Sequence, residues 1–240
     1  MIGGFIITGN TPKNVAIRAL GPSLQQAGLV DVLQDPILEL RGSDGRVLSQ
    51  NDNWKDDSTT ASQLQAKGFA LSNDLEAGIV ATLAPGAYTA TLRGKNETTG
   101  NALVELYDLD EASDCQLANI STRGSVQSGD AVMIGGFILG GDDGTKILIR
   151  ALGPSLAEFG VPDTLPNPVL ELRDGNGALL QRNQNWRDTQ ETAIRATGIP
   201  PSHDAEAAVV ADVAPGAYTA IVSGEGGATG VALVEVYNLP

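Results

Sequence analysis

The chain has 240 residues, of which 42% are hydrophobic and only 4% aromatic, and its formal net charge at pH 7 is −14. Nucleic acids and anionic membrane surfaces repel such a chain, because both are bound through clustered Lys and Arg side chains. No apolar run approaches the roughly 20 residues of a membrane-spanning helix. The sequence contains one cysteine, Cys115, so an internal disulfide is impossible.

The sequence is one unit written twice. Residues Arg18–Leu24, RALGPSL, recur unchanged as Arg150–Leu156, at an offset of 132 (150 − 18). Residues Pro85–Ala90, PGAYTA, recur as Pro215–Ala220, at an offset of 130 (215 − 85). Because a unit of this length has the size of an ordinary domain, we predict two domains. Any functional site should then appear in both copies.

The first copy reads as a series of short strands separated by turns. Residues 14–20 are apolar on both faces apart from Arg18, which predicts a central strand covered on both sides. Residues 59–67 predict a short helix that ends at Gly68. In chain order, the expected strands are residues 3–8, 14–20, 36–41, 46–49, 76–83, 88–93 and 102–107.

Seven or eight short strands with frequent turns and almost no helix predict an all-β fold in each copy. We expect two tandem antiparallel β-sandwich domains, jelly-roll-like and related by the internal repeat, with a β-barrel as the alternative. The predicted domains are residues 1–110 and residues 133–240. Residues 111–132 are predicted to link them.

The predicted linker contains a strand without a duplicate, residues 117–126, along which side chains alternate in character. One interpretation is a linker ordered by local contacts, or a strand whose mate was cut away. The other is that one domain lacks an edge strand and takes one from a neighbouring molecule, which gives open, head-to-tail assembly. The residues expected to carry such an assembly are Leu117, Asn119, Ile120, Thr122 and Val126.

Several ordered motifs recur in both copies and identify a resemblance. They are IGGF, RALGPSL, PGAYTA and ALVE, joined in the first copy by NDNW and after it by LANISTRG. Together they resemble the tandem RALGPSL repeats of large secreted bacterial proteins, over nearly the whole chain. The resemblance implies a β-rich extracellular repeat, usually found in arrays, and no assigned activity.

A serine hydrolase is one reading of the Gly-Pro-Ser turn. Ser23 and Ser155 are candidate nucleophiles, and His203 next to Asp204 is a candidate base. The serine repeats, but the histidine does not, because the first copy has Asn73 at that position (203 − 130). The turn also lacks the Gly-x-Ser-x-Gly pattern of a nucleophile elbow. The sequence therefore predicts no catalytic residue and no enzyme.

The polar loop around the first tryptophan is a candidate calcium site, because Ca²⁺ takes about 6–8 oxygen ligands. The second copy of the loop loses charge at Gln184 and Thr189, so the first copy should bind better. The alternative is a loop whose side chains cap turns and the following helix. The candidate ligands are Asn51, Asp52, Asn53, Asp56, Asp57, Asp74 and Glu76.

Trp54 and its repeat Trp186 are candidate ligand-binding residues. An exposed indole ring beside asparagines could form a platform for a sugar. The alternative is that each ring plugs the end of its sandwich, with its N–H bonded to backbone.

Arg18 and Arg150 lie in otherwise apolar strands and predict a structural ion pair with a repeated glutamate. The candidate partners are Glu39 and Glu171, or Glu105 and Glu235.

These patterns together favour a non-catalytic extracellular or cell-surface structural protein: a fibre or filament subunit, a stalk or an adhesin spacer. The expected partners are other copies of the chain or neighbouring repeats of a longer one, and neither nucleic acid nor membrane insertion is expected. The alternative function is a carbohydrate-binding or calcium-stabilised adhesion module, with glycans as partners. No cofactor is predicted beyond that candidate Ca²⁺.

Overall fold

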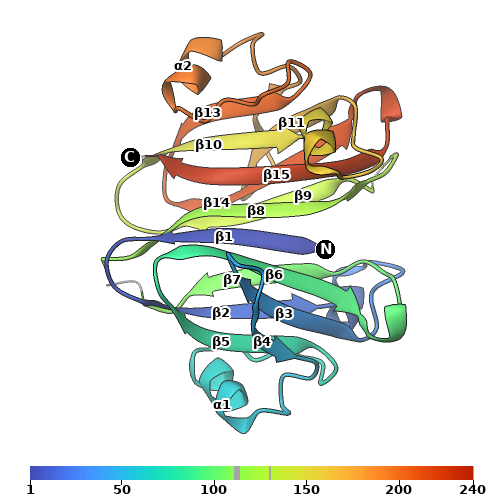
Figure 1. Ribbon diagram of the computed structural model, residues 1–240, viewed down its shortest axis with the longest axis vertical. Coiled ribbons are helices and arrows are strands. Elements are labelled where there is room, and N and C mark those ends of the chain that lie inside the picture. The colour runs from blue at the N-terminus through green and yellow to red at the C-terminus, as the bar shows by residue number, and fades with distance from the viewer. Residues whose placement is uncertain (111–113, 130, 240) are drawn as a thin grey trace. The chain divides into compact units, whose positions relative to one another are not determined.

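The computed structural model describes residues 1–110, 114–129 and 131–239, and it divides into two compact units (Figure 1). Unit 1 ends at Ala118 and unit 2 begins at Asn119. The sheets of both units are antiparallel and account for most of the regular secondary structure, which confirms the predicted all-β class. No helix within the described residues has the length and apolar character needed to cross a membrane.

Unit 1 contains two antiparallel sheets. The first has the order β1 (Ile2–Thr8), β6 (Gly86–Gly94), β3 (Pro36–Gly42) and β4 (Val47–Asn51). The second has the order β5 (Ala77–Leu83), β2 (Lys13–Leu20) and β7 (Leu103–Asp108). Strand β2 is central, as the apolar pattern of both its faces predicts.

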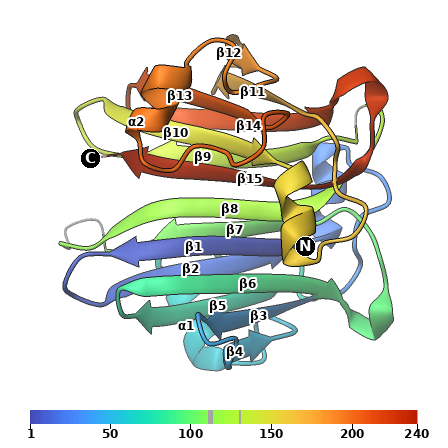
Figure 2. The ribbon, with the colours of Figure 1, turned by 45° about the horizontal axis from the view of Figure 1, so that its top comes forward.

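Unit 2 repeats these sheets and adds one strand. One sheet has the order β9 (Met133–Leu139), β14 (Gly216–Gly224), β11 (Pro168–Asp174) and β12 (Leu179–Asn183). The other has the order β13 (Ala207–Val213), β10 (Thr145–Leu152), β15 (Gly230–Leu239) and β8 (Gln116–Val126). Figures 1 and 2 both show β8 beside β15. The strand predicted inside the linker is therefore an edge strand of unit 2.

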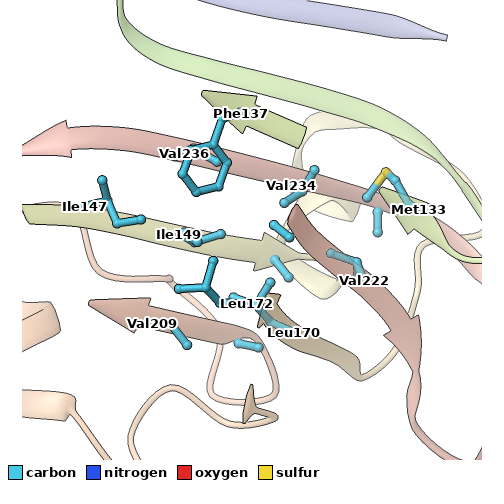
Figure 3. Packing of buried hydrophobic residues seen from close by; sticks show 14 of the residues in the cluster. Met133, Phe137, Ile147, Ile149, Leu170, Leu172, Val209, Val222, Val234 and Val236 are labelled. Carbon is cyan, nitrogen blue, oxygen red and sulfur yellow. The ribbon is translucent and has the colours of Figure 1, made fainter. Parts of the chain in front are cut away.

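The sheets of unit 2 enclose an aliphatic core, as expected for a β-sandwich. Phe137 from β9, Ile149 from β10, Leu170 from β11, Val222 from β14 and Val234 from β15 meet there (Figure 3). Every second residue of each strand points inward, because successive side chains of a strand alternate between its faces. The matching residues of unit 1, such as Phe5, Ile17 and Leu38, are also buried.

Short helices join the strands. Helix α1 (Ser58–Ala66) packs through Ala61 and Leu64 on the outer face of the β5-β2-β7 sheet, and α2 (Glu191–Ala196) packs through Ile194 on the matching sheet of unit 2. A six-residue 3₁₀ helix begins at the proline of each Gly-Pro-Ser motif, η1 (Pro22–Ala27) and η3 (Pro154–Phe159). A three-residue 3₁₀ turn follows β6 and β14, η2 (Lys95–Glu97) and η4 (Glu225–Gly227).

Candidate functional site

The RALGPSL turn is held by a buried glutamate. The Glu76 carboxylate accepts hydrogen bonds from Gly21 N at 3.1 Å, from Ser23 N at 3.0 Å and from the Ser23 hydroxyl. Glu76 is 0% exposed. A Cβ at Gly21 would lie 2.0 Å from the Leu33 carbonyl oxygen, so a glycine is required for this close approach. The motif is therefore a carboxylate-anchored turn.

Unit 2 builds the same turn from the same residue types. The Glu206 carboxylate accepts hydrogen bonds from Gly153 N at 3.1 Å, from Ser155 N at 3.0 Å and from the Ser155 hydroxyl at 2.5 Å. Its second oxygen also accepts a hydrogen bond from His203 N at 3.3 Å.

The contacts of both serines differ from those of the candidate hydrolase. Each hydroxyl donates to a glutamate that is 0% exposed, and not to an imidazole base. The imidazole Nδ1 of His203 accepts a hydrogen bond from Ala205 N at 3.2 Å. Both serines are part of the scaffold.

The motif arginine forms the predicted ion pair. Arg18 donates from Nε to Glu105 at 2.7 Å and from Nη1 to the Phe69 carbonyl at 3.0 Å. Its guanidinium lies 5.2 Å from the centre of the Tyr107 ring. Of the two candidate glutamates, the structure selects Glu105, because Glu39 pairs with Arg41 and Arg93 instead.

Unit 2 repeats this cluster. Arg150 donates to Glu235 at 2.9 Å and to the Ile199 carbonyl at 2.9 Å, and it lies 5.2 Å from the Tyr237 ring centre. Burial, followed by the nearby Glu235 charge, raises the pKa of Tyr237 to about 12. The same two causes raise the pKa of Tyr107 in unit 1. Because a deprotonated tyrosine would be poorly solvated there, the cluster favours the neutral phenol.

The candidate calcium ligands are used as caps and turns. Asp57 is the N-cap of α1, where its carboxylate accepts hydrogen bonds from Thr59 N at 2.9 Å and from the Thr60 hydroxyl at 2.8 Å. The bonds from Thr60 and Thr59 lower the pKa of Asp57. Asn51 spans the loop, because it donates to the Asn53 carbonyl and accepts a hydrogen bond from Gly78 N.

The remaining candidate ligands point to different partners. Asp52 pairs with Lys95 at 2.7 Å, Asp74 pairs with Lys55 at 2.5 Å, and Asp56 accepts a hydrogen bond from Asn53. The Glu76 carboxylate faces the RALGPSL turn, while its backbone carbonyl accepts a hydrogen bond from Trp54 N of this loop at 2.8 Å. Within residues 1–110, 114–129 and 131–239, no group of three His, Cys, Asp or Glu side chains could hold a metal ion. The capping alternative therefore describes this loop better than a calcium site.

Both tryptophans are buried, so neither provides the exposed ring that a sugar platform requires. Trp54 is 2% exposed and Trp186 is 1% exposed. Each ring lies in the small cluster under its helix, and a cation covers it: Lys55 in unit 1, and Arg187 with Arg195 in unit 2. Trp186 donates from Nε1 to the His203 carbonyl at 3.2 Å, as the plug alternative predicts, whereas Nε1 of Trp54 is buried without such a bond.

The candidate assembly residues lie along the junction of β8 with β15. Asn119, Ile120 and Thr122 stand opposite Tyr237, Val236 and Val234, and Val126 stands opposite Gly230. Leu117 is half-buried and precedes this paired stretch. Val126 enters the core, Ile120 packs against it, and the buried Asn119 amide donates to the Val236 carbonyl at 3.1 Å. The structure thus brings four of the five residues together on one strand edge.

Sequence reasoning missed the role of Glu76, which it grouped with the loop acids. Glu76 is repeated as Glu206, but so are Asp56 and Asp74, as Asp188 and Asp204. Recurrence alone therefore did not separate the anchoring glutamate from the loop acids. Sequence reasoning also missed the buried Lys13, which pairs with Asp108 at 2.7 Å and has no lysine at the matching position of unit 2.

Comparison with known proteins gives a likeness of fold alone. No family model matches the chain, and no curated protein matches it. Among solved structures it is similar to the atomic structure of Sulfolobus Turreted Icosahedral Virus, at 9% identity and a TM-score of 0.29, over 100% of this chain and 89% of that one. It is also similar to the major capsid protein P2 from Bacteriophage PM2, at 8% identity and a TM-score of 0.26, over 100% and 92% of the two chains. At these scores the likenesses have no bearing on function.

Proposed function

We propose that the chain is a non-catalytic structural repeat protein of the cell exterior: a fibre or filament subunit, a stalk or an adhesin spacer. We propose further that it belongs with the RALGPSL repeats that it resembles. The observation that carries this proposal is the use of the repeated motif. In both units the motif glycine, serine and arginine make all their described bonds inside their own unit.

A duplicated motif whose polar groups form bonds within the scaffold supports a mechanical role more than a chemical one. The two glutamate-anchored turns each tie the end of a central strand to a loop far along the chain, at residues 76 and 206. Such long-range bonds hold a sandwich together when its ends are pulled. Neither serine is available as a nucleophile, and the candidate metal ligands serve as caps and ion-pair partners.

The proposed partners are other copies of this chain or neighbouring repeats of a longer one. The unduplicated strand supports this choice, because it completes the sheet of unit 2 while the matching edge of unit 1 has no added strand in the described residues. We propose no glycan or calcium function, since both tryptophan rings are buried and the loop acids are paired.

Single-molecule force spectroscopy on the intact chain, tethered at its ends, tests the structural role. Each unit has about 120 residues, so we expect two separate unfolding events, each releasing on the order of 40 nm of chain at ~3.5 Å per residue. The matched variant Glu76→Ala should weaken one event and leave the other unchanged. A smooth extension without force peaks would reject a load-bearing role.

A further inference from the structure

We propose that the open edge of β7 is an acceptor site for a strand of the β8 sequence type, supplied by another repeat. This inference rests on the proposed function as a repeat protein and names the partner of that repeat. Strand β7 has a counterpart, β15, 130 residues later (233 − 103). Strand β15 pairs with β8 from Gly230 to Tyr237, whereas β7 is the last strand of its sheet within the described residues.

The two edges present nearly the same side chains. Along the six positions from residue 102 to residue 107, only one differs between the copies, Leu106 against Val236. The identical pairs are Ala102 with Ala232, Leu103 with Leu233, Val104 with Val234, Glu105 with Glu235 and Tyr107 with Tyr237. A strand that fits β15 therefore meets the same surface on β7.

The backbone of β7 is also set to receive a strand. Leu109 N donates to the Asn14 carbonyl at 2.9 Å, and this bond fixes which residues of β7 face β2. In an antiparallel ladder the residues that bond to one neighbour alternate with those that point away. By this alternation the N–H and C=O groups of Val104 and Leu106 point to the open edge. Their counterparts, Val234 and Val236, face Thr122 and Ile120 of β8.

Exposure shows what the missing strand would cover. Val234 is 2% exposed and Val236 is 7% exposed beneath β8. The matching Val104 and Leu106 are only half-buried. In unit 2 the cover comes from β8, whose Val126 is part of the core and whose Ile120 packs against it. Unit 1 therefore has an apolar edge without the two side chains that would close it.

The register of β8 on β15 defines the partner. The incoming strand runs antiparallel to β7 and places its equivalent of Thr122 opposite Val104 and its equivalent of Ile120 opposite Leu106. It carries an asparagine one residue before that isoleucine, because Asn119 donates its amide to the carbonyl of Val236, the counterpart of Leu106. The partner is thus a strand with the pattern Asn-Ile-x-Thr-x-Gly-x-Val.

Stoichiometry decides where that strand comes from. The described chain holds one β8 and two edges that fit it, β15 and β7. If copies merely exchanged β8 among themselves, each chain would still have one open edge, so exchange alone brings no gain in pairing. The donor is therefore a β8-type strand from another repeat, present in addition to the one that unit 2 uses.

A synthetic peptide with the β8 sequence, residues 116–126, tests the proposal on the intact chain. We expect saturable binding of one peptide per chain by fluorescence anisotropy. Hydrogen exchange should then show new protection at Val104 and Leu106 and no change along β15. Absence of saturable binding, protection at any other strand, or displacement of the chain's own β8 from β15 would each overturn the assignment.

Backbone N-methylation of the peptide provides matched controls. A methyl group on the N atom of Ile120 or Thr122 removes a donor that faces the acceptor strand, and it should weaken binding by about tenfold or more. The same group on Ser121 lies on the opposite edge and should leave the affinity nearly unchanged. Equal effects at both positions would overturn the proposed pairing. A chain that resists force but binds no peptide keeps its structural role and loses only this site.

Discussion

Units 1 and 2 share one scaffold, yet they stabilise the same places with different charges. In unit 1 the buried Lys13 pairs with Asp108 at 2.7 Å and also donates to the Asp110 carbonyl. At the matching positions of unit 2, the hydroxyl of Thr145 donates to the amide oxygen of Asn238 at 2.8 Å. A charged pair in one unit is thus a neutral pair in the other, with both members changed together.

A second pair of sites shows the same concerted change. In unit 1 Lys95 lies 2.7 Å from Asp52 and 3.5 Å from Asp35. In unit 2 the counterpart of Lys95 is Glu225, and the counterpart of Asp35 is Asn167, whose amide donates to that glutamate. The sign of the charge is reversed, but the contact survives. The glutamate-anchored turns are identical in both units, whereas these two ion pairs, one of them built on the buried Lys13, differ between the units in both members.

The largest effect should come from the fixed turns. Replacing Glu76 by Ala leaves buried donors without an acceptor, and we expect unit 1 to lose ~3–5 kcal/mol of unfolding free energy. Urea denaturation followed by Trp54 fluorescence, in a Trp186→Phe background, measures it. Glu97→Gln on an exposed turn is the control. An unchanged midpoint for Glu76→Ala would show that the anchor is dispensable.

The neutral pair of unit 2, Thr145 with Asn238, should be able to replace the charged pair of unit 1, Lys13 with Asp108. Lys13→Thr alone leaves Asp108 without its cation, and we expect a loss of ~2 kcal/mol, at the lower end for a broken buried pair because Asp108 is partly exposed. Adding Asp108→Asn recreates the neutral pair of unit 2 and should restore at least half of the loss. The same single-tryptophan denaturation measures both variants. A double variant no better than the single one would mean that the two positions vary independently.

Alkaline pH should destabilise unit 2 through Tyr237. Its folded pKa of about 12 lies above the ordinary value of 10, so the folded state holds its proton more tightly than the unfolded state. The stabilisation is complete below pH 10 and is lost as the pH rises from 10 to 12. Stability of unit 2 should therefore fall over this interval, and Tyr237→Phe should reduce the fall. A denaturation series by pH checks this; identical slopes for the variant and the parent protein would contradict it.

The smallest expected effect is that of calcium on unit 1. The candidate ligands already cap α1 or pair with lysines, although the Oδ1 atoms of Asp52 and Asn53 are buried without a protein partner. We expect superimposable thermal melts in calcium and in chelator. A higher temperature of the first unfolding transition in calcium than in chelator would support a calcium site in unit 1.

The order of the strands could be predicted from sequence because alternation and turns are local properties. The apolar faces of β2 and the single arginine within it already indicated a central strand with an ion pair. The partner of that arginine remained open between Glu39 and Glu105, since both lie on strands and both are repeated. Only the register, which places Glu105 directly opposite Arg18, decides between them.

The candidate site was harder to predict because it depends on contacts between distant segments. The loop around Trp54 looks like a cation site when only its own residues are considered. Lys55 pairs with Asp74, and Lys95, 43 residues after Asp52 in the sequence, pairs with Asp52. Trp54 is buried against α1, in which Ala61 and Leu64 are the only buried residues. Two small or medium apolar residues give the helix only a weak apolar face, so the burial of Trp54 was hard to predict from the sequence.

The pairing of β8 also changes where one repeat ends and the next begins. The recurrence of the sequence places the start of the second copy at Met133, but β8, the strand that completes the sheet of unit 2, starts 17 residues earlier (133 − 116), at Gln116. The structural boundary between the two repeats therefore differs from the boundary that the sequence duplication indicates. A truncation at Met133 removes the edge strand β8 from the sandwich of unit 2. A truncation just before Gln116 keeps that strand and leaves the sandwich complete.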